Sequence, residues 1–273
     1  MPSPAELESA KLSWTIIAAL GTGMAAVATG IWAVFVWFYQ RWKDHRAERQ
    51  RNVALYVHPF LFAAEELQSR LYNILKLHGL KPLMDPANPH PFAEETVYLI
   101  AQYLAWERAI LRHGPYTGDA TVIKLTRAVR QAFATDALGA DLRIFHPEQS
   151  AIAQAMMRRL PGPLGQEFEV MPSTEFRRAL APPLPPAPPQ GAVARWLGWS
   201  RPRAECVEPS ALADIGSLRR AVDTLAATRD PQAPPGAQRL AQVQGHLVAL
   251  LAYLEKKERL QLFDGKRLTA LDA

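Results

Sequence analysis

The sequence predicts an all-α fold: a single transmembrane helix followed by a cytoplasmic bundle of about six helices with a proline-rich connector. Three observations lead to this prediction. A long uncharged segment lies near the N-terminus, and apolar residues recur at helical spacing through much of the remaining chain. No run of alternating apolar residues is long enough for a strand. The 273 residues, 49% hydrophobic and 21% charged, suit one sizeable globular domain with an appendage.

The first element is the expected membrane helix, over residues 14–40. The segment Leu12–Gln40 contains 29 residues and no charge. At about 1.5 Å of rise per residue, this length is enough to cross a hydrocarbon core of about 30 Å. Trp14 at one end and Trp37 and Trp42 at the other match the aromatic belts of membrane helices.

A cleaved signal peptide is the competing interpretation of this segment, because Ala26–Ala28 resembles a cleavage site. Against it, Glu6 and Glu8 precede the apolar run, where a signal peptide carries positive charge. The apolar run also continues for a further ten residues, GIWAVFVWFY, beyond that site. We therefore expect an uncleaved anchor.

Basic residues set the expected orientation. Five follow the apolar segment: Arg41, Lys43, Arg46, Arg49 and Arg51. Lys11 stands alone before it, so the positive-inside rule places the tail 1–13 outside and the rest of the chain in the cytoplasm. A single cysteine, Cys206, fits a reducing compartment. The same five basic residues are expected to contact anionic lipid headgroups.

Small residues form one row along the expected membrane helix, namely Ala18, Thr22, Ala26 and Gly30. Such a row lets two helix backbones approach closely, which favours a homo-oligomer or a partner membrane protein. The alternative is that small residues are simply common in membrane helices.

The helical domain is expected over residues 41–165. A charged helical segment is followed by Pro59, which breaks or kinks a helix. Helices are then expected at residues 60–78 and 92–113, each ending at a glycine. A third helix begins after Thr117-Gly118-Asp119, and a fourth begins at the segment HPEQ, with Pro147 in its first turn.

The C-terminal part begins with a proline-rich connector at residues 166–205, which includes APPLPPAPPQ and its PxxP spacings. We interpret it as a connector, although a peptide-binding module can recognise such spacings. Apolar residues then recur at helical spacing near Leu212–Leu225 and Leu240–Leu254. Residues 206–273 are therefore expected to form a helical hairpin that packs on the domain.

Polar residues within these apolar helices form the candidate site. Gln68, Asn73 and Gln102 are expected to satisfy one another between the helices at 60–78 and 92–113, because an unpaired buried amide costs about 1–3 kcal/mol. Glu66 and Arg70 are spaced to pair, and Glu107 and Arg108 are expected to leave by one edge. The candidate network or pocket contains Glu66, Gln68, Arg70, Asn73, Gln102 and Glu107.

Signatures of catalysis and of cofactors are missing from the sequence. The seven histidines form no pair at metal-ligand spacing, and there is no Walker loop or nucleophile elbow. We therefore expect no catalytic residues, no metal and no cofactor. The basic row Lys124, Arg127 and Arg130 is interpreted as a solvated face, so no nucleic-acid partner is expected.

Three blocks, AAEELQSRLYNIL, YLIAQYLAWERAILR and RIFHPEQSAIAQAM, resemble those of an uncharacterised family of small proteins. In that family an N-terminal membrane helix precedes a helical soluble domain. The resemblance covers roughly residues 55–157 and implies this architecture, but no activity.

Two functions follow from these expectations. The first is a single-pass membrane-anchored scaffold or protein-interaction protein with a cytoplasmic all-α domain. The second is a membrane-tethered enzyme or small-ligand receptor with a polar pocket between the helices at 60–78 and 92–113. An open cleft there favours the second function, and a closed interface with paired amides favours the first.

Overall fold

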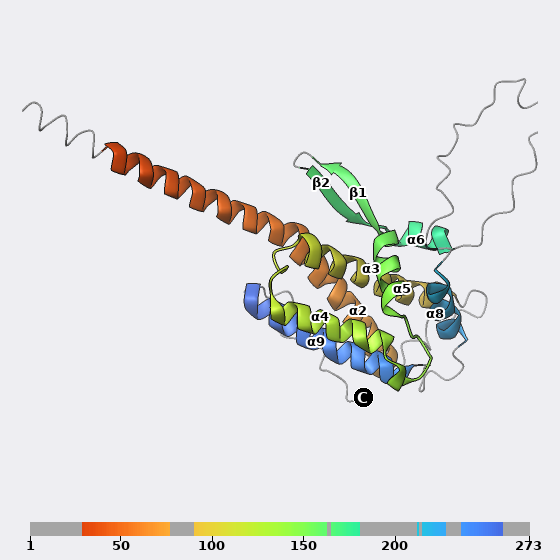
Figure 1. Ribbon diagram of the computed structural model, residues 1–273. Coiled ribbons are helices and arrows are strands. Elements are labelled where there is room, and N and C mark those ends of the chain that lie inside the picture. Colours follow the sequence, from red (N-terminus) through yellow and green to blue (C-terminus); the bar gives the residue numbers. More distant parts are fainter. Residues whose placement is uncertain are drawn as a thin grey trace, which may run out of the picture. The chain divides into compact units, whose positions relative to one another are not determined.

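The computed structural model describes residues 29–76, 90–162, 165–180, 212, 215–227 and 236–258. The chain divides into two compact units, Met1–Asn52 and Val53–Ala273. Most of the described residues are helical, as Figure 1 shows, so the expected all-α class is confirmed at this level.

The first unit contains one described helix, at residues 29–52. Within the described part of the chain, no helix combines the length and apolar character that crossing a membrane requires. Residues 14–28 of the expected span lie outside the described residues, as do Ala18, Thr22 and Ala26. Gly30 lies inside them, near the start of the helix.

The second unit begins with a short π-helix, η1 (Val53–Val57), followed by α2 (His58–Lys76). Pro59 has no backbone N–H to donate, so the helical hydrogen-bond ladder is interrupted at that residue. A π-helical turn directly before it accommodates the interruption. The break expected from Pro59 is therefore present as a change of helical pitch.

The remaining elements follow in chain order, and most begin with recognisable sequence signals. They are α3 (His90–His113), α4 (Ala120–Ala134), η2 (Asp136–Leu138), α5 (His146–Met156), β1 (Met157–Gly162), β2 (Gly165–Val170), α6 (Ser173–Leu180), α8 (Gly216–Ala226) and α9 (Ala237–Glu258). The Asp119 carboxylate caps α4 by accepting from the amides of Thr121 and Val122, at 2.9 and 3.1 Å. Pro147 occupies the first turn of α5, as its position in the sequence indicates.

Helix α3 is the centre of the domain. It packs against α2, α5 and α8, and Ile100, Tyr103 and Leu104 are buried in its middle. The apolar residues distributed nearly all round this helix indicate that central position. Helix α9 packs on α2 and α4 instead, and α4 and α9 lie side by side in Figure 1.

The hairpin expected from the two C-terminal helices is not how they pack. Among the described residues, α8 packs mainly against α3, whereas α9 packs against α2 and α4. The two helices therefore cover different parts of the core. Their apolar stripes predicted burial but could not identify the helix against which each one packs.

An antiparallel hairpin, β1–β2, was not expected from the sequence. Met157 pairs with Val170 and Gly162 with Gly165, so the strands replace the end expected for the fourth helix and the beginning of the connector. The His113 and Phe168 rings stack at 4.5 Å between centroids, and this contact joins β2 to α3. Within the connector expected at residues 166–205, the structure places most of β2 and all of α6, and residues 181–205 lie outside the described residues.

Arg239 ties α9 to the end of α4. Its side chain is completely buried, and it donates hydrogen bonds to five backbone carbonyls, those of Ala132, Phe133, Thr135, Gly139 and Asp141, at 2.6 to 3.0 Å. Carbonyls at a helix C-terminus have no partner within the helix, and a cation there also complements the helix dipole. The guanidinium therefore stabilises both the end of α4 and the loop after it.

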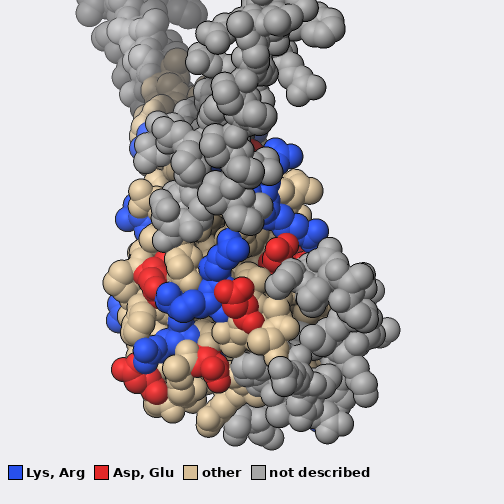
Figure 2. All heavy atoms as spheres, turned by 90° about the vertical axis from the view of Figure 1, so that its right-hand side faces the viewer, with Lys and Arg blue, Asp and Glu red and all other residues tan. Residues whose placement is uncertain are grey.

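Charges of both signs share the surface of the domain. On the face shown in Figure 2, Lys and Arg side chains form a band, with Asp and Glu side chains beside it. Ion pairs join Arg220 to Glu148, at 3.1 Å, and Arg158 to Glu175.

Candidate functional site

The structure separates the residues of the expected polar network. Gln68 is buried on α2, but its Nε2 has no hydrogen-bond partner among the described residues. The Oε1 of Gln102 is likewise without a partner, and Asn73 is exposed. The expected network is therefore not formed: Gln68 Nε2 and Gln102 Oε1 do not bond to each other, and Asn73 lies on the solvent side of α2.

Arg70 joins α2 to α3 in a different way from the expected one. Its Nη2 lies 2.8 Å from Glu95 Oε2 on α3, and its guanidinium carbon lies 4.6 Å from the centre of the Phe92 ring. The ion pair of Arg70 is therefore with Glu95 on the neighbouring helix and not with Glu66, which is exposed on α2. A partner on a neighbouring helix is a tertiary feature, which spacing along one helix does not reveal.

Among the expected site residues, Glu107 has the most unusual environment. It does not leave by an edge of α3 into solvent, because it is only 3% exposed. Its Oε2 lies 4.0 Å from Arg130 Nε on α4, and its Oε1 has no hydrogen-bond partner among the described residues. Burial raises the pKa of this carboxyl to about 8, although the positive charge of Arg130 acts in the opposite direction. Glu107 therefore holds its proton at neutral pH.

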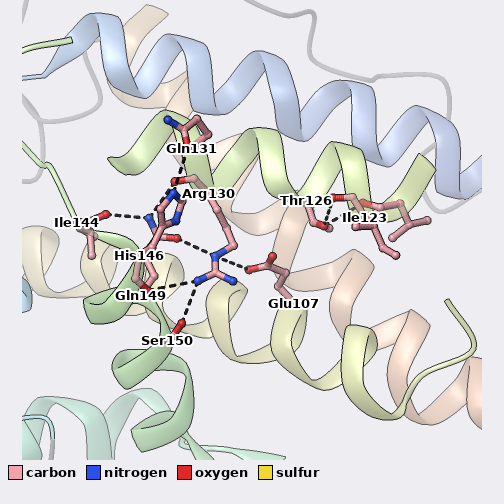
Figure 3. Close-up of polar contacts among 10 residues, drawn as sticks. Glu107, Ile123, Thr126, Arg130, Gln131, Ile144, His146, Gln149 and Ser150 are labelled. Carbon is pink, nitrogen blue, oxygen red and sulfur yellow. Dashed lines mark hydrogen bonds and ion pairs between the residues drawn. The ribbon is translucent and has the colours of Figure 1, made fainter. Parts of the chain in front are cut away.

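Arg130 is held in place by α5, as Figure 3 shows. Its Nε donates to Gln149 Oε1 at 3.1 Å, and its Nη2 donates to Ser150 Oγ at 3.0 Å and to the His146 carbonyl at 3.4 Å. Gln149 is itself fixed, because its Nε2 donates to the carbonyls of Arg130 and Ile144 at 2.9 and 2.8 Å. These bonds leave the guanidinium near Glu107 without a short, direct ion pair to it.

Two pockets meet at Glu107 and Arg130. The first, of about 270 Å³, lies between α3, α4 and α5 and is also lined by Arg108, Arg112, Gln149 and Ser150. The second, of about 410 Å³, is also lined by Thr126, Arg127, Gln131 and His146. Neither pocket is lined by a residue of α2. These two pockets therefore lie on a different side of α3 from the pocket expected between α2 and α3.

Sequence reasoning misplaced Arg130 and did not identify Gln149 or Ser150. Lys124 and Arg127 are exposed, as the interpretation of a solvated face requires, but Arg130 is partly buried and bonded to α5. One signal for this difference was present. Thr126 and Phe133, which are on the buried side of α4, lie four residues before and three residues after Arg130 and so share a face with it.

The donor set of these pockets suits anions better than metals. No group of three or more His, Cys, Asp or Glu residues capable of holding a metal ion occurs within the described ranges. Guanidinium groups, a neutral carboxyl and a hydroxyl instead provide hydrogen-bond donors.

The basic residues expected at lipid headgroups lie on the helix at residues 29–52. Arg41, Lys43, Arg46 and Arg49 are exposed, and Arg51 is partly buried. The guanidinium carbons of Arg41 and Arg46 lie 5.6 and 5.4 Å from the ring centres of Trp37 and Trp42. On this part of the helix, two arginines therefore each lie over the tryptophan four residues earlier.

No protein-family model, curated protein or solved structure matches the chain. The resemblance of the three helical blocks to an uncharacterised family stays an expectation from the sequence.

Proposed function

We propose that the protein is a single-pass membrane-anchored interaction protein whose helical domain lies in the cytoplasm. One observation supports the anchor above all others. Eight large apolar or aromatic side chains on the helix at residues 29–52 are each more than half exposed: Ile31, Trp32, Val34, Phe35, Trp37, Phe38, Tyr39 and Trp42. A contiguous apolar surface of this extent is unfavourable in water and is typical of a surface covered by lipid or by another protein.

The residues after this surface favour lipid as the covering. Arg41 and Arg46 lie beside Trp37 and Trp42, and Lys43 and Arg49 are also exposed. Tryptophan and long basic side chains together are characteristic of the boundary between hydrocarbon and headgroups. We therefore expect anionic headgroups to contact the five basic residues from Arg41 to Arg51.

Self-association through the membrane helix is part of the same proposal. At Gly30, an added Cβ would meet no described atom within 4 Å apart from the adjoining residues and the backbone of its own helix, so this position is open to a neighbour. Together with Ala18, Thr22 and Ala26 in the sequence, it completes the row of small residues. We expect Gly30→Ile to reduce oligomerisation in native mass spectrometry of the protein released from detergent.

A second function, reception of a small ligand, is favoured by the pockets at Glu107 and Arg130. The Glu107 carboxyl is buried, and one of its oxygens has no partner among the residues that the structure describes, a feature that packing alone does not require. This function is compatible with a membrane anchor, since the ligand site and the apolar helix involve different residues.

Membrane extraction tests the anchor. The full-length protein should remain in the membrane pellet after washing with alkaline carbonate and should dissolve in non-ionic detergent. Two arginines within the span, Val27→Arg with Ile31→Arg, should release it, because each arginine near the middle of a bilayer costs about 2.5–3.5 kcal/mol.

A matched control places the two arginines beyond the span, as Ala47→Arg with Asn52→Arg, and this variant should stay in the pellet. Release of the unmodified protein by carbonate alone would contradict the anchor.

A further inference from the structure

We propose that the pocket between α3, α4 and α5 binds a small oxyanion, a phosphate or carboxylate group carried on an apolar body. This inference specifies the ligand class for the second proposed function, reception of a small ligand, and rests on that function, but it does not depend on the membrane anchor. Three observations support it: a cluster of three arginines, a buried carboxyl with one oxygen unpaired within the described ranges, and apolar residues in the same pocket.

The arginines supply the first observation. Arg108, Arg112 and Arg130 line one pocket of about 270 Å³. Neither Arg108 nor Arg112 forms an ion pair with any residue that the structure describes. Burial lowers the pKa of Arg108, and the neighbouring charges of Arg112 and Arg130 lower it further. Like charges gathered at one cavity repel each other until an anion binds there, and the guanidinium fork matches the oxygens of phosphate and carboxylate.

Glu107 supplies the second observation. Glu107 lines the pocket and is only 3% exposed, and its Oε1 has no hydrogen-bond partner among the described residues. As a neutral acid, it donates a hydrogen bond to an oxyanion. A cationic ligand is the opposite possibility for a buried glutamate, but three guanidinium groups around the same cavity disfavour it.

Ser150 and the apolar residues complete the site. Ser150 Oγ accepts from Arg130 Nη2 at 3.0 Å, which leaves its own proton to donate to a ligand. Leu104, Leu111 and Ala153 line the remainder of the pocket and suit a small carbon skeleton. A volume of about 270 Å³ corresponds to a small molecule, so the anion is borne by a compact compound or by a single headgroup.

The site should respond to pH. The groups that surround Glu107 are Tyr103, Arg108 and Arg112 of α3, Arg127 and Arg130 of α4, and His146 at the start of α5. The arginines keep their charge across the accessible range, and Tyr103 stays neutral because burial raises its pKa well above the usual value. Ionisation of Glu107, with a pKa of about 8, then removes a donor and adds repulsion. Binding should therefore weaken as the pH rises above that value.

Calorimetric titration of the full-length protein in non-ionic detergent with phenyl phosphate tests the proposal. We expect saturable binding with one site per chain at pH 7. The Kd should increase about 30-fold at pH 9.5, because each unit above the pKa costs about a factor of ten. Phenol, which lacks the anion, should not bind, and inorganic phosphate, which lacks the apolar body, should bind more weakly.

Variants distinguish a ligand-binding site from a purely structural role of Glu107 and the arginines. Arg108→Gln should raise the Kd at least tenfold at pH 7, whereas Lys124→Gln, the same charge change at an exposed position of α4, should leave it within twofold. Glu107→Gln keeps a donor but cannot ionise, so its Kd should be independent of pH. If Arg108→Gln lowers the unfolding temperature, the exposed Arg112→Gln takes its place.

Competition with lipid nanodiscs identifies the source of the anion. Nanodiscs of phosphatidylglycerol should compete with phenyl phosphate if the site takes a headgroup, and those of phosphatidylcholine should not. An absence of competition indicates a soluble ligand. The proposal is overturned if phenyl phosphate does not bind saturably, if Arg108→Gln and Arg112→Gln leave the Kd unchanged, or if Glu107→Gln retains the pH dependence. Each of these results leaves the membrane anchor unaffected.

Discussion

Two buried ionisable residues illustrate what a single side chain decides in this protein. Arg239 is completely buried and fully satisfied, with five carbonyl acceptors. Glu107 is almost as deeply buried, yet one of its oxygens has no partner in the described part of the chain and the other lies 4.0 Å from Arg130 Nε. The first residue therefore stabilises the fold, and the second is retained at an energetic cost that a ligand can offset.

Replacing Arg239 should strongly destabilise the domain. Arg239→Met keeps much of the packed volume but leaves five carbonyls without their donor, so the free energy of unfolding should fall by about 3 kcal/mol or more. Urea unfolding of the full-length protein in detergent, followed by circular dichroism, measures this change. Arg220→Met is the control, because the Arg220 side chain is largely exposed in its ion pair with Glu148, and it should cost less than about 1 kcal/mol. Equal effects of the two variants would contradict the role assigned to Arg239.

Glu107 should make the fold less stable as the pH rises. Between its unfolded pKa near 4.5 and its folded pKa of about 8, the folded state binds a proton that the unfolded state has lost. The free energy of unfolding therefore decreases across this range, by an amount on the order of 5 kcal/mol at about 1.4 kcal/mol per pKa unit, and levels off above it. Glu107→Gln should remove this slope in urea unfolding measured from pH 5 to 9. An unchanged slope in that variant would assign the effect to other groups.

The elements depend on local signals at their ends and on tertiary contacts in their interiors. Asp119 caps α4, Pro147 begins α5 and Pro59 coincides with the π-helical turn, and each of these residues has a direct backbone consequence. The β1–β2 hairpin lacks such a strong signal, since only Phe168 and Val170 alternate with acidic residues in β2. The hairpin is held to α3 by the stacking of Phe168 on His113 and to α6 by the ion pair of Arg158 with Glu175. In both contacts the two residues are distant in sequence.

The start of α9 depends on a glycine. Gly236 has φ +67°, and an added Cβ would lie 3.2 Å from the Asp141 carbonyl oxygen. Gly236→Ala should therefore destabilise the domain by about 1–2 kcal/mol, the usual cost of a left-handed conformation for a residue with a side chain. The midpoint of thermal unfolding measures the effect. Gly118→Ala, where an added Cβ meets no atom within 4 Å, should leave that midpoint nearly unchanged. A similar shift in both variants would mean that backbone strain is not the cause.

At the scale of the whole molecule, the proposed function depends on which side of a membrane each part occupies. The chain carries a single cysteine, Cys206, in the part expected to lie in the cytoplasm. The tail 1–13 is expected outside, because the basic residues follow the apolar segment rather than precede it.

Thiol labelling of intact cells checks this orientation. A membrane-impermeant maleimide should not label Cys206 until the cells are lysed. With Cys206→Ser and Ser3→Cys combined, the new thiol in the tail should be labelled in intact cells. The reverse pattern would invert the proposed topology.

The sequence by itself determined the helical class, the starts of α3, α4 and α5, the central position of α3 and the apolar, uncharged segment near the N-terminus. Each of these features depends on residues that are neighbours along the chain, through caps, proline geometry or helical periodicity. Only the tertiary structure decided the partners: Arg70 with Glu95, Arg130 with Gln149 and Ser150, Arg239 with the end of α4, and Glu107 with a cavity. Burial of a polar side chain depends on which helices pack around it. The sequence of one helix specifies its apolar face, but it does not specify the helix that covers that face.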